Sequence, residues 1–245
     1  MRGWAVIAGA SMALAACSAF GTDPTTDTSD GGASDGGASA GSTPDAFTSG
    51  DASAFTCPDG ALCEDFEGTL LDWTAKGKTA MKVVEGFSAP HAGQFDVSTI
   101  ATCSIEKSMR RAATDSHLTM TMKLRLDTPA GAFVKGPQLR LGQLIVGVAF
   151  ENDILICDVG NSSDAGTGDI NVAPLTKGST WHDITIDVTQ GAPLTIVTCS
   201  LDKSGSVMAT DDATLPGDPA VVVLGSNHAE GAFEFSIDDV VVTTR

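Results

Sequence analysis

Residues 118–127 read LTMTMKLRLD, and this stretch decides the fold. Apolar side chains stand at every second position, and Thr, Lys or Arg fills the positions between them. Successive side chains of a β-strand point to opposite faces, so the pattern puts all the apolar residues on one face. The sequence therefore predicts a half-buried strand of an antiparallel sheet. The buried positions would be Leu118, Met120, Met122, Leu124 and Leu126.

The rest of the chain after residue 56 also shows strand patterns rather than any helical period. HDITIDV at 182–188 alternates in the same way, and PLTIVTCSLD at 193–202 and AVVVLGS at 220–226 are rich in strand-forming residues. We expect two longer strands at 138–150 and 152–160, joined near 151–153. Many short strands separated by turns predict an all-β antiparallel sandwich of the jelly-roll type. The predicted turns are TPAGAF, NSSDAGTGD, TKGST, TQGAP, LPGDP and SNHAEG.

Three segments together resemble one fold family. The opening CPDGALCEDFEG (57–68) with Trp73, the middle GSTWHDITIDV (178–188) and the closing FSIDDVVV (235–242) are similar to laminin-G/concanavalin A-like jelly rolls. The DFE start and the IDDV finish also resemble MAM-type domains of that group. The resemblance covers residues 57–245 and implies one jelly-roll domain there.

The N-terminus has the build of an export signal. Residues 1–17 carry one positive charge, then an apolar run, then Leu-Ala-Ala-Cys. This ending resembles the lipobox of bacterial lipoproteins, which implies that Cys17 is acylated and that Ser18 directs the protein to the outer membrane, facing the periplasm or the cell surface. An ordinary cleaved signal is the alternative. Acylation at Cys17 would anchor the protein to a membrane without spanning it.

Residues 18–56 predict a flexible tether, because they are rich in Gly, Ser, Ala, Thr and Asp and contain no basic residue. The whole chain has a formal net charge of −17. This charge disfavours nucleic acid and anionic membrane surfaces as partners. We expect a glycan or an extracellular protein instead.

Export makes disulfides expected among the remaining cysteines. Cys57 and Cys63 are close in sequence, which favours a local bridge at the start of the domain. Cys157 and Cys199 lie in predicted strands and could pair across the sheet, which would leave Cys103 as a buried thiol. Other pairings stay open, because connectivity does not follow from sequence alone.

Two adjacent carboxylates, Asp238 and Asp239, interrupt the last predicted strand. In a jelly roll the first and last strands lie side by side, which would bring residues 64–67 close to this pair. Opposed carboxylates suit a hard cation, so Glu67, Asp238 and Asp239 are candidate ligands of a structural Ca²⁺. The resemblance implies a cation in the same place. The alternative is that Asp238 faces solvent while Asp239 marks a bulge or binds a loop amide.

Evidence for catalysis is weak in the sequence. Glucanase-like members of the fold carry E-x-D-x-x-E, whereas here Ile156 follows Glu151 and Asp153 at the position of the second Glu, and Asp158 comes two residues later. A turn carrying acidic residues is the preferred interpretation. Lyase-like members use tyrosine, and the chain contains none. The four histidines lack an acidic or thiol companion at motif spacing, and His182 is expected to be structural.

The sequence thus favours a non-catalytic binding or adhesion lipoprotein. Aromatic residues for sugar stacking are few, and the resemblance implies structural roles for Trp73 and Trp181. A divergent polysaccharide-active enzyme, with Glu151 and Asp153 as its acid pair, is the first alternative. A structural envelope protein without a small ligand is the second.

Overall fold

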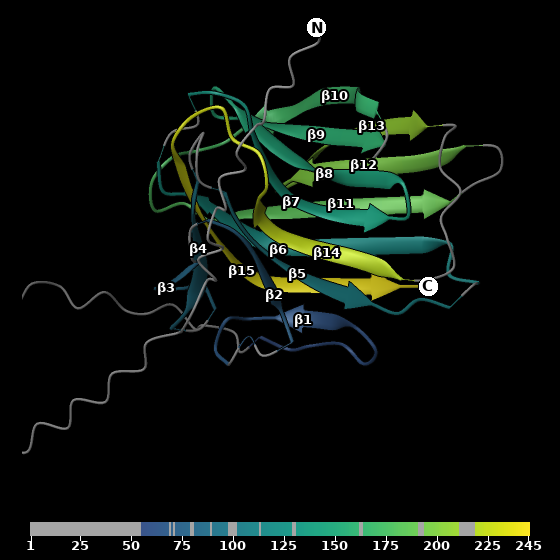
Figure 1. Cartoon of the computed structure of the whole chain (residues 1–245), viewed down its shortest axis with the longest axis horizontal. Coiled ribbons are helices and arrows are strands. Elements are labelled where there is room, and N and C mark those ends of the chain that lie inside the picture. The colour runs from purple at the N-terminus through teal and green to yellow at the C-terminus, as the bar shows by residue number, and fades with distance from the viewer. Residues whose placement is uncertain are drawn as a thin grey trace, which may run out of the picture. The chain divides into compact units, whose positions relative to one another are not determined.

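The computed structural model describes residues 55–245 except 69, 71, 79–80, 89, 98–101, 113, 129–130, 162–163, 191–193 and 211–218. This part of the chain contains fifteen strands and no helix. The strands form two antiparallel sheets that stack as a sandwich (Figure 1). The predicted all-β sandwich is confirmed.

Sheet A has eight strands in the order β13-β12-β11-β6-β15-β4-β3, with β1 paired to β15. Its central strand β6 contains the stretch that alternates in the sequence, and the predicted apolar face is buried. The bounds are β1 (Leu62–Glu64), β3 (Lys82–Val84), β4 (Ala92–Val97), β6 (His117–Leu126), β11 (His182–Gln190), β12 (Thr195–Leu201), β13 (Ser204–Thr210) and β15 (Phe233–Thr244).

Sheet B has seven strands in the order β10-β9-β8-β7-β14-β5-β2. Its central strands are largely apolar on the face toward sheet A. The bounds are β2 (Thr74–Gly77), β5 (Cys103–Met109), β7 (Val134–Leu141), β8 (Leu144–Glu151), β9 (Ile154–Asn161), β10 (Asp164–Pro174) and β14 (Ala220–Ser226).

A cluster of phenylalanines holds the two sheets together. Phe95, Phe233 and Phe235 come from sheet A and Phe150 from sheet B, and each is at most 1 % exposed. Neighbouring ring centroids lie 5.3 to 5.6 Å apart. Contacts of this kind add to the free energy gained by burying the rings.

Two sequence predictions about strands were wrong. Residues 138–150 form a hairpin rather than one long strand, because the chain turns at Gly142, whose φ of 66° suits a tight two-residue turn. Most of NSSDAGTGD belongs to strands: Asn161 ends β9 and Asp164 begins β10. The predicted junction at 151–153 is correct, since Asn152 and Asp153 form the turn between β8 and β9 with φ of 49° and 60°.

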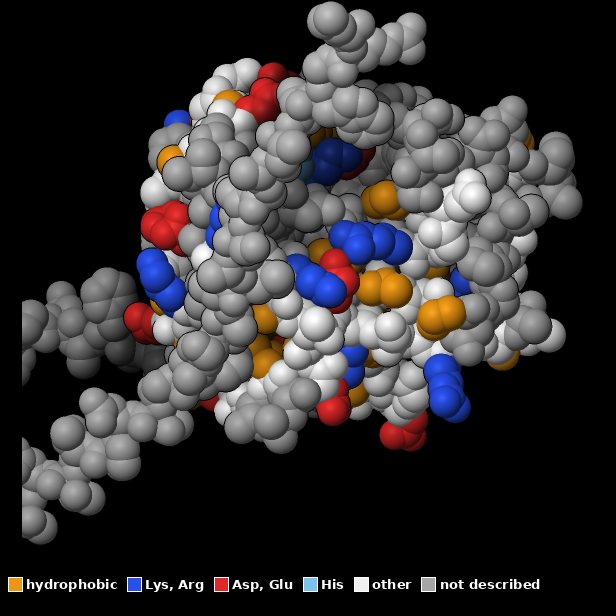
Figure 2. Space-filling model, viewed as in Figure 1, with side chains coloured by type: hydrophobic (Ala, Val, Ile, Leu, Met, Phe, Trp, Pro, Cys, Tyr) orange, Lys and Arg blue, Asp and Glu red, His pale blue; other side chains and the backbone are white. Residues whose placement is uncertain are grey.

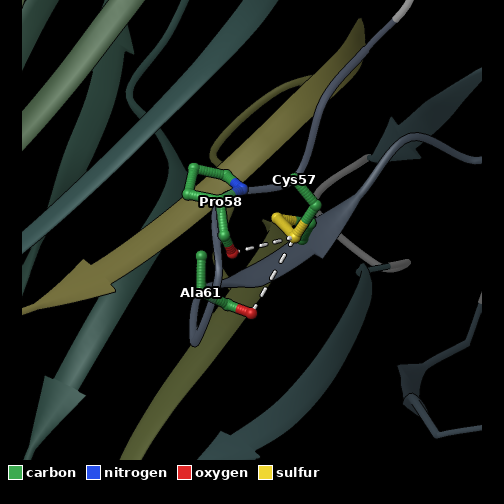
Figure 3. The surroundings of a disulfide bond; sticks show 4 residues. Cys57, Pro58 and Ala61 are labelled. Atoms are coloured by element: carbon green, nitrogen blue, oxygen red, sulfur yellow. Dashed lines mark hydrogen bonds between the residues drawn. A yellow bond between two sulfur atoms is a disulfide. The ribbon is translucent and has the colours of Figure 1, made fainter.

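The two ends of the domain lie side by side, as expected. β1 pairs with β15, with Cys63 opposite Val241. The Cys57–Cys63 disulfide closes the loop that leads into β1 (Figure 3). The Cys57 sulfur also lies 3.7 Å from the carbonyl oxygen of Pro58 and 3.9 Å from that of Ala61. The bridge therefore fixes the entry of the chain beside its last strand.

A second disulfide joins Cys157 to Cys199. Cys157 lies on β9 of sheet B and Cys199 on β12 of sheet A, so the bridge connects the two sheets instead of crossing a single sheet. Cys103 takes part in neither disulfide and is buried on β5. The predicted pairing of Cys157 with Cys199 is confirmed. The prediction that this bridge crosses a single sheet is wrong, because it joins the two sheets.

Residues 1–54 lie outside the described residues. The predicted signal segment, the acylation of Cys17 and nearly all of the predicted linker therefore stay predictions, as does the domain boundary at residue 57. Within the described part of the chain no helix is long and apolar enough to cross a bilayer.

Candidate functional site

Asp238 is a buried anchor rather than an exposed carboxylate. It lies on β15 between β4 and β6, and it is 0 % exposed. Its Oδ2 accepts hydrogen bonds from the backbone N–H groups of Phe87 (2.7 Å) and Ser88 (3.3 Å), and its Oδ1 accepts one from Asp239 N–H (2.8 Å). Burial raises the pKa of Asp238 to about 6, although these hydrogen bonds oppose the rise. The carboxylate fastens the segment between β3 and β4 to sheet A.

Asp239 lies in a β-bulge. Its φ is 49°, and the pairing of β15 with β6 shifts register between Asp238 and Val241. The Ser88 hydroxyl donates to Asp239 Oδ1. The alternative interpretation was right about the bulge and wrong about Asp238, which faces backbone amides instead of solvent.

Glu67 does not join the two aspartates in one cluster. Its carboxylate accepts a hydrogen bond from the backbone N–H of His91 (2.7 Å) and lies 3.0 Å from the His91 ring Nδ1. Nearby, Glu64 accepts a 2.6 Å hydrogen bond from the indole N–H of the buried Trp73. Among the described residues no group of three or more His, Cys, Asp or Glu could hold a metal ion. The structural Ca²⁺ stays a prediction.

A row of side chains crosses the outer face of sheet B, and we call it the sheet B row. Strand register places its members opposite one another, from the edge strand β10 to the edge strand β2. Three of the members, Gln138, Asp158 and Val223, are at most 5 % exposed although they lie outside the core between the sheets. The floor of this face is therefore withdrawn from bulk solvent. The row is Asp169, Asp158, Gly147, Gln138, Val223, Glu106 and Thr74.

Two ion pairs connect the sheet B row to the positions beside it. Lys135 Nζ lies 2.8 Å from Asp158 Oδ2, and Arg140 Nη1 lies 3.0 Å from Glu106 Oε1. Partial burial raises the pKa of Asp169, and the neighbouring charge of Asp158 raises it further. The face thus presents a basic donor beside an acidic acceptor at two places. Figure 2 shows basic and acidic side chains lying next to one another on the surface.

A pocket of about 530 Å³ opens at the β2 end of the sheet B row. Lys107 is part of its wall, with Nζ 3.8 Å from Asp72 Oδ2 and 5.6 Å from the centre of the Trp73 ring. The lining is mostly polar and charged, which suits a ligand with many hydroxyl groups. The lining residues are Asp72, Thr74, Lys76, Glu106, Lys107, Ser108 and Val221.

Local backbone irregularities shape this floor. The pairing of β7 with β8 shifts register between Lys135 and Gln138, which marks a bulge. Opposite Gln138 stands Gly147, where an added Cβ would lie 2.7 Å from Gln138 Cβ and 2.8 Å from the Pro137 carbonyl oxygen. Only glycine lets the bulged strand approach so closely.

The carboxylates within the sheet B row do not have glycosidase spacing. Hydrolysis of a glycosidic bond uses two carboxyl groups roughly 5 to 10 Å apart. Asp158 and Asp169 are closer, because they share a side-chain hydrogen bond. Asp158 and Glu106 stand four strands apart, about 19 Å at ordinary strand spacing. The predicted candidates Glu151 and Asp153 lie at the β8–β9 turn, where Asp153 pairs with Lys177 at 2.6 Å.

The histidines have acidic companions that the sequence did not reveal, since three of the partners come from distant segments. Buried His182 uses both ring nitrogens, Nδ1 with Asp202 (3.0 Å) and Nε2 with the backbone of Thr176, so its structural role fits the expectation.

His117 contacts Asp187 (2.6 Å) through Nε2. The Thr119 hydroxyl oxygen lies 3.4 Å from that same nitrogen. In a catalytic triad the acid and the nucleophile contact different ring nitrogens, so these three side chains do not have triad geometry. The remaining pairs are His91–Glu67 and His228–Glu230.

Comparison with protein-family models gives no match, and comparison with curated protein sequences gives no significant match. Solved structures share the fold at low identity. Cellulose-induced protein Cip1 has a TM-score of 0.56 at 12 % identity, over 74 % of this chain and 96 % of its own. Crh5 transglycosylase has 0.54 at 16 %, over 76 % and 88 %. The carbohydrate esterase vb_24B_21 of bacteriophage phi24B has 0.52 at 15 %, over 74 % and 94 %. These likenesses establish the β-sandwich fold.

Proposed function

We propose that the protein binds a glycan along the outer face of sheet B and does not cleave it. The observation that carries the proposal is the sheet B row, with its ion pairs Lys135–Asp158 and Arg140–Glu106 beside a pocket. Each pair holds a donor and an acceptor in fixed positions. Sugar hydroxyls both donate and accept hydrogen bonds, so a glycan can engage both members of each pair.

The dimensions and charge of the face favour a neutral polysaccharide. The sheet B row crosses seven strands, which is roughly 29 Å at ordinary strand spacing and suits several sugar units in a line. Two of the acidic side chains here are paired with basic ones, whereas the chain as a whole has a net charge of −17. An acidic polysaccharide would meet long-range repulsion, and a neutral one would not.

The named neighbours support this class of ligand. Carbohydrate chemistry appears in the names of a transglycosylase, an esterase and a cellulose-induced protein. A shared fold alone does not carry an activity over. The proposal that the protein does not cleave its ligand rests on the carboxylate spacing within the sheet B row, not on these neighbours.

An exported, lipid-anchored protein would display this face outside the cytoplasm. Residues 1–17 and 18–56 would supply the anchor at Cys17 and the tether, and the folded domain would meet a glycan of the envelope or its surroundings. Labelling with radioactive palmitate tests the anchor. Incorporation that disappears in Cys17→Ala supports it, and an unlabelled mature protein contradicts it.

A glycan array with the chain lacking residues 1–17, run with Ca²⁺ and again with EDTA, tests the proposed function. We expect binding to neutral polysaccharides. Loss of both binding and thermal stability in EDTA would support the predicted Ca²⁺ ligands. A blank array in both conditions would contradict glycan binding and favour a protein partner or a structural role.

Array binding of the Gln138→Leu variant tests whether the glycan binds at the sheet B row. The substitution keeps the side-chain volume of this buried residue and removes its amide, so the fold should survive. We expect binding to fall roughly tenfold, the effect of losing one or two buried hydrogen bonds. Thr121→Val on the exposed face of β6 is the matched control and should bind like the wild type.

The divergent-enzyme alternative has one observation in its favour. Asp169 stands beside Asp158, and partial burial together with the neighbouring Asp158 raises the pKa of Asp169, which is a feature of carboxyl groups in acid–base chemistry. Incubating the protein with the polysaccharide that binds on the array distinguishes an enzyme from a non-catalytic binding protein. New reducing ends or unsaturated products that vanish in Asp169→Asn would favour the enzyme, and intact polysaccharide would favour binding alone.

A further inference from the structure

The outer face of sheet A, on the other side of the sandwich, carries a pair of aromatic rings. Phe87, in the segment between β3 and β4, is 47 % exposed. Its ring meets that of Trp181 edge to face, with centroids 6.2 Å apart at 66°. We propose that Phe87 and Trp181 form a stacking site for one sugar residue of a neutral glycan, separate from the sheet B row.

Strand β6 supports both rings from one side. Lys123 Nζ lies 4.3 Å from the centre of the Phe87 ring, and Arg125 Cζ lies 4.7 Å from the centre of the Trp181 ring. Residues two apart on a strand are roughly 6.8 Å apart, close to the distance between the rings. One cation therefore lies over each ring, and cation–π attraction favours this arrangement.

The backbone that carries Phe87 is fixed while its side chain faces solvent. Asp238 binds the backbone N–H groups of Phe87 and Ser88, and the Gly86 N–H donates to the Pro90 carbonyl oxygen (3.2 Å). A binding group held in this way loses little conformational entropy when a ligand arrives. Core packing does not need this arrangement, since Phe87 lies outside the buried core cluster.

The edge of the ring pair carries the polar groups that a sugar needs. Asp183, 62 % exposed at its side chain, lies 2.6 Å from Lys123 Nζ and borders Phe87 through that lysine. A pyranose ring has an apolar C–H face bordered by hydroxyl groups. It can place that face on Phe87 and direct hydroxyls to Asp183 and Lys123. Lys123 is paired with Asp183, and Arg125 is paired with Asp127 (2.7 Å), so neither cation is left without a counter-charge and the site suits a neutral sugar.

Isothermal titration of the chain lacking residues 1–17 tests the proposal, with cellohexaose, laminarihexaose, chitohexaose and mannohexaose as probes. We expect Phe87→Ala to weaken binding of at least one probe roughly tenfold, which is the size of one aromatic stacking contact. Val83→Ala is the matched control, because Val83 is likewise an exposed apolar residue, 50 % exposed on the neighbouring strand β3. Its binding should match the wild type.

The outcomes separate this site from the sheet B row. Loss of binding in Phe87→Ala, with Gln138→Leu unaffected, would support the ring pair and contradict the proposed function. The reverse result would overturn the ring pair and leave the proposed function standing. The NMR signal of the Trp181 indole N–H reports binding at the ring pair in the wild-type protein, without any substitution. A signal that stays unmoved at saturation with every probe would overturn the proposal.

Discussion

At the scale of single residues, Asp238 explains how the last strand accommodates two neighbouring carboxylates. The side chain is buried, and three backbone amides from two segments surround it. Asp239 occupies a bulge, where its positive φ is one that Asp tolerates better than most residues. The sequence indicates the unusual pair. It does not indicate the partners, because Phe87 is 151 positions away.

This burial predicts a pH dependence of stability. Folded Asp238 keeps its proton up to about pH 6, whereas an unfolded Asp loses it near 3.8. Between these values the folded state binds more protons, so the free energy of unfolding falls as pH rises, by on the order of 3 kcal/mol over the whole interval. Urea unfolding from pH 3.5 to 7 should show this fall in the wild type and a smaller one in Asp238→Asn.

Asp96→Asn is the control, since Asp96 is a partly exposed carboxylate on the same sheet. Its unfolding profile should keep the wild-type slope. A difference between the wild type and Asp238→Asn that stays constant across this pH range would contradict the account of Asp238.

At the scale of elements, the bulge in β7 and Gly147 on β8 create the floor of the candidate site. Interior strands such as β6 and β11 could be predicted from sequence, because a buried face imposes strict alternation. The edge strands β10 and β13 could not, since DAGTGDINVAP and SGSVMAT resemble loops in composition. A sheet edge tolerates such residues because it needs pairing on one side only.

Gly147→Ala should destabilise the protein by about 1 to 3 kcal/mol, because the new Cβ would overlap Gln138 and the Pro137 carbonyl oxygen. Gly160→Ala on the adjacent strand β9 is the matched control. No atom lies within 4 Å of its added Cβ, so it should be neutral or slightly stabilising. Thermal unfolding of both variants checks this, and equal melting temperatures would contradict the close approach of β7 and β8.

At the scale of the whole molecule, two disulfides and an aromatic core hold the sandwich together. One bridge closes a short loop at the entry of the chain, and the other joins sheet B to sheet A across 42 residues. The cysteine pairs could be proposed from sequence, because two are local and two lie in apolar strands. The sheet B row could not, since Glu106, Gln138 and Asp158 come from three separate segments and meet only through strand order.

The two bridges should differ in their effect on stability. Loop-closure entropy predicts a stabilisation of about 4 kcal/mol for Cys157–Cys199 and about 2 kcal/mol for Cys57–Cys63. Replacing each pair by alanines and measuring urea unfolding tests the order. A larger loss for the Cys57–Cys63 pair would contradict the structural role assigned to the bridge between the sheets.

The proposed glycan site lies on the outer face of sheet B. The most direct test is a ¹H–¹⁵N NMR titration of the chain lacking residues 1–17 with the neutral oligosaccharide that binds best on the array. We expect shifts of the backbone amide signals of Gln138, Gly147 and Asp158, and we expect these shifts to disappear in Gln138→Leu. Saturating ligand that leaves these three amides unmoved would contradict it.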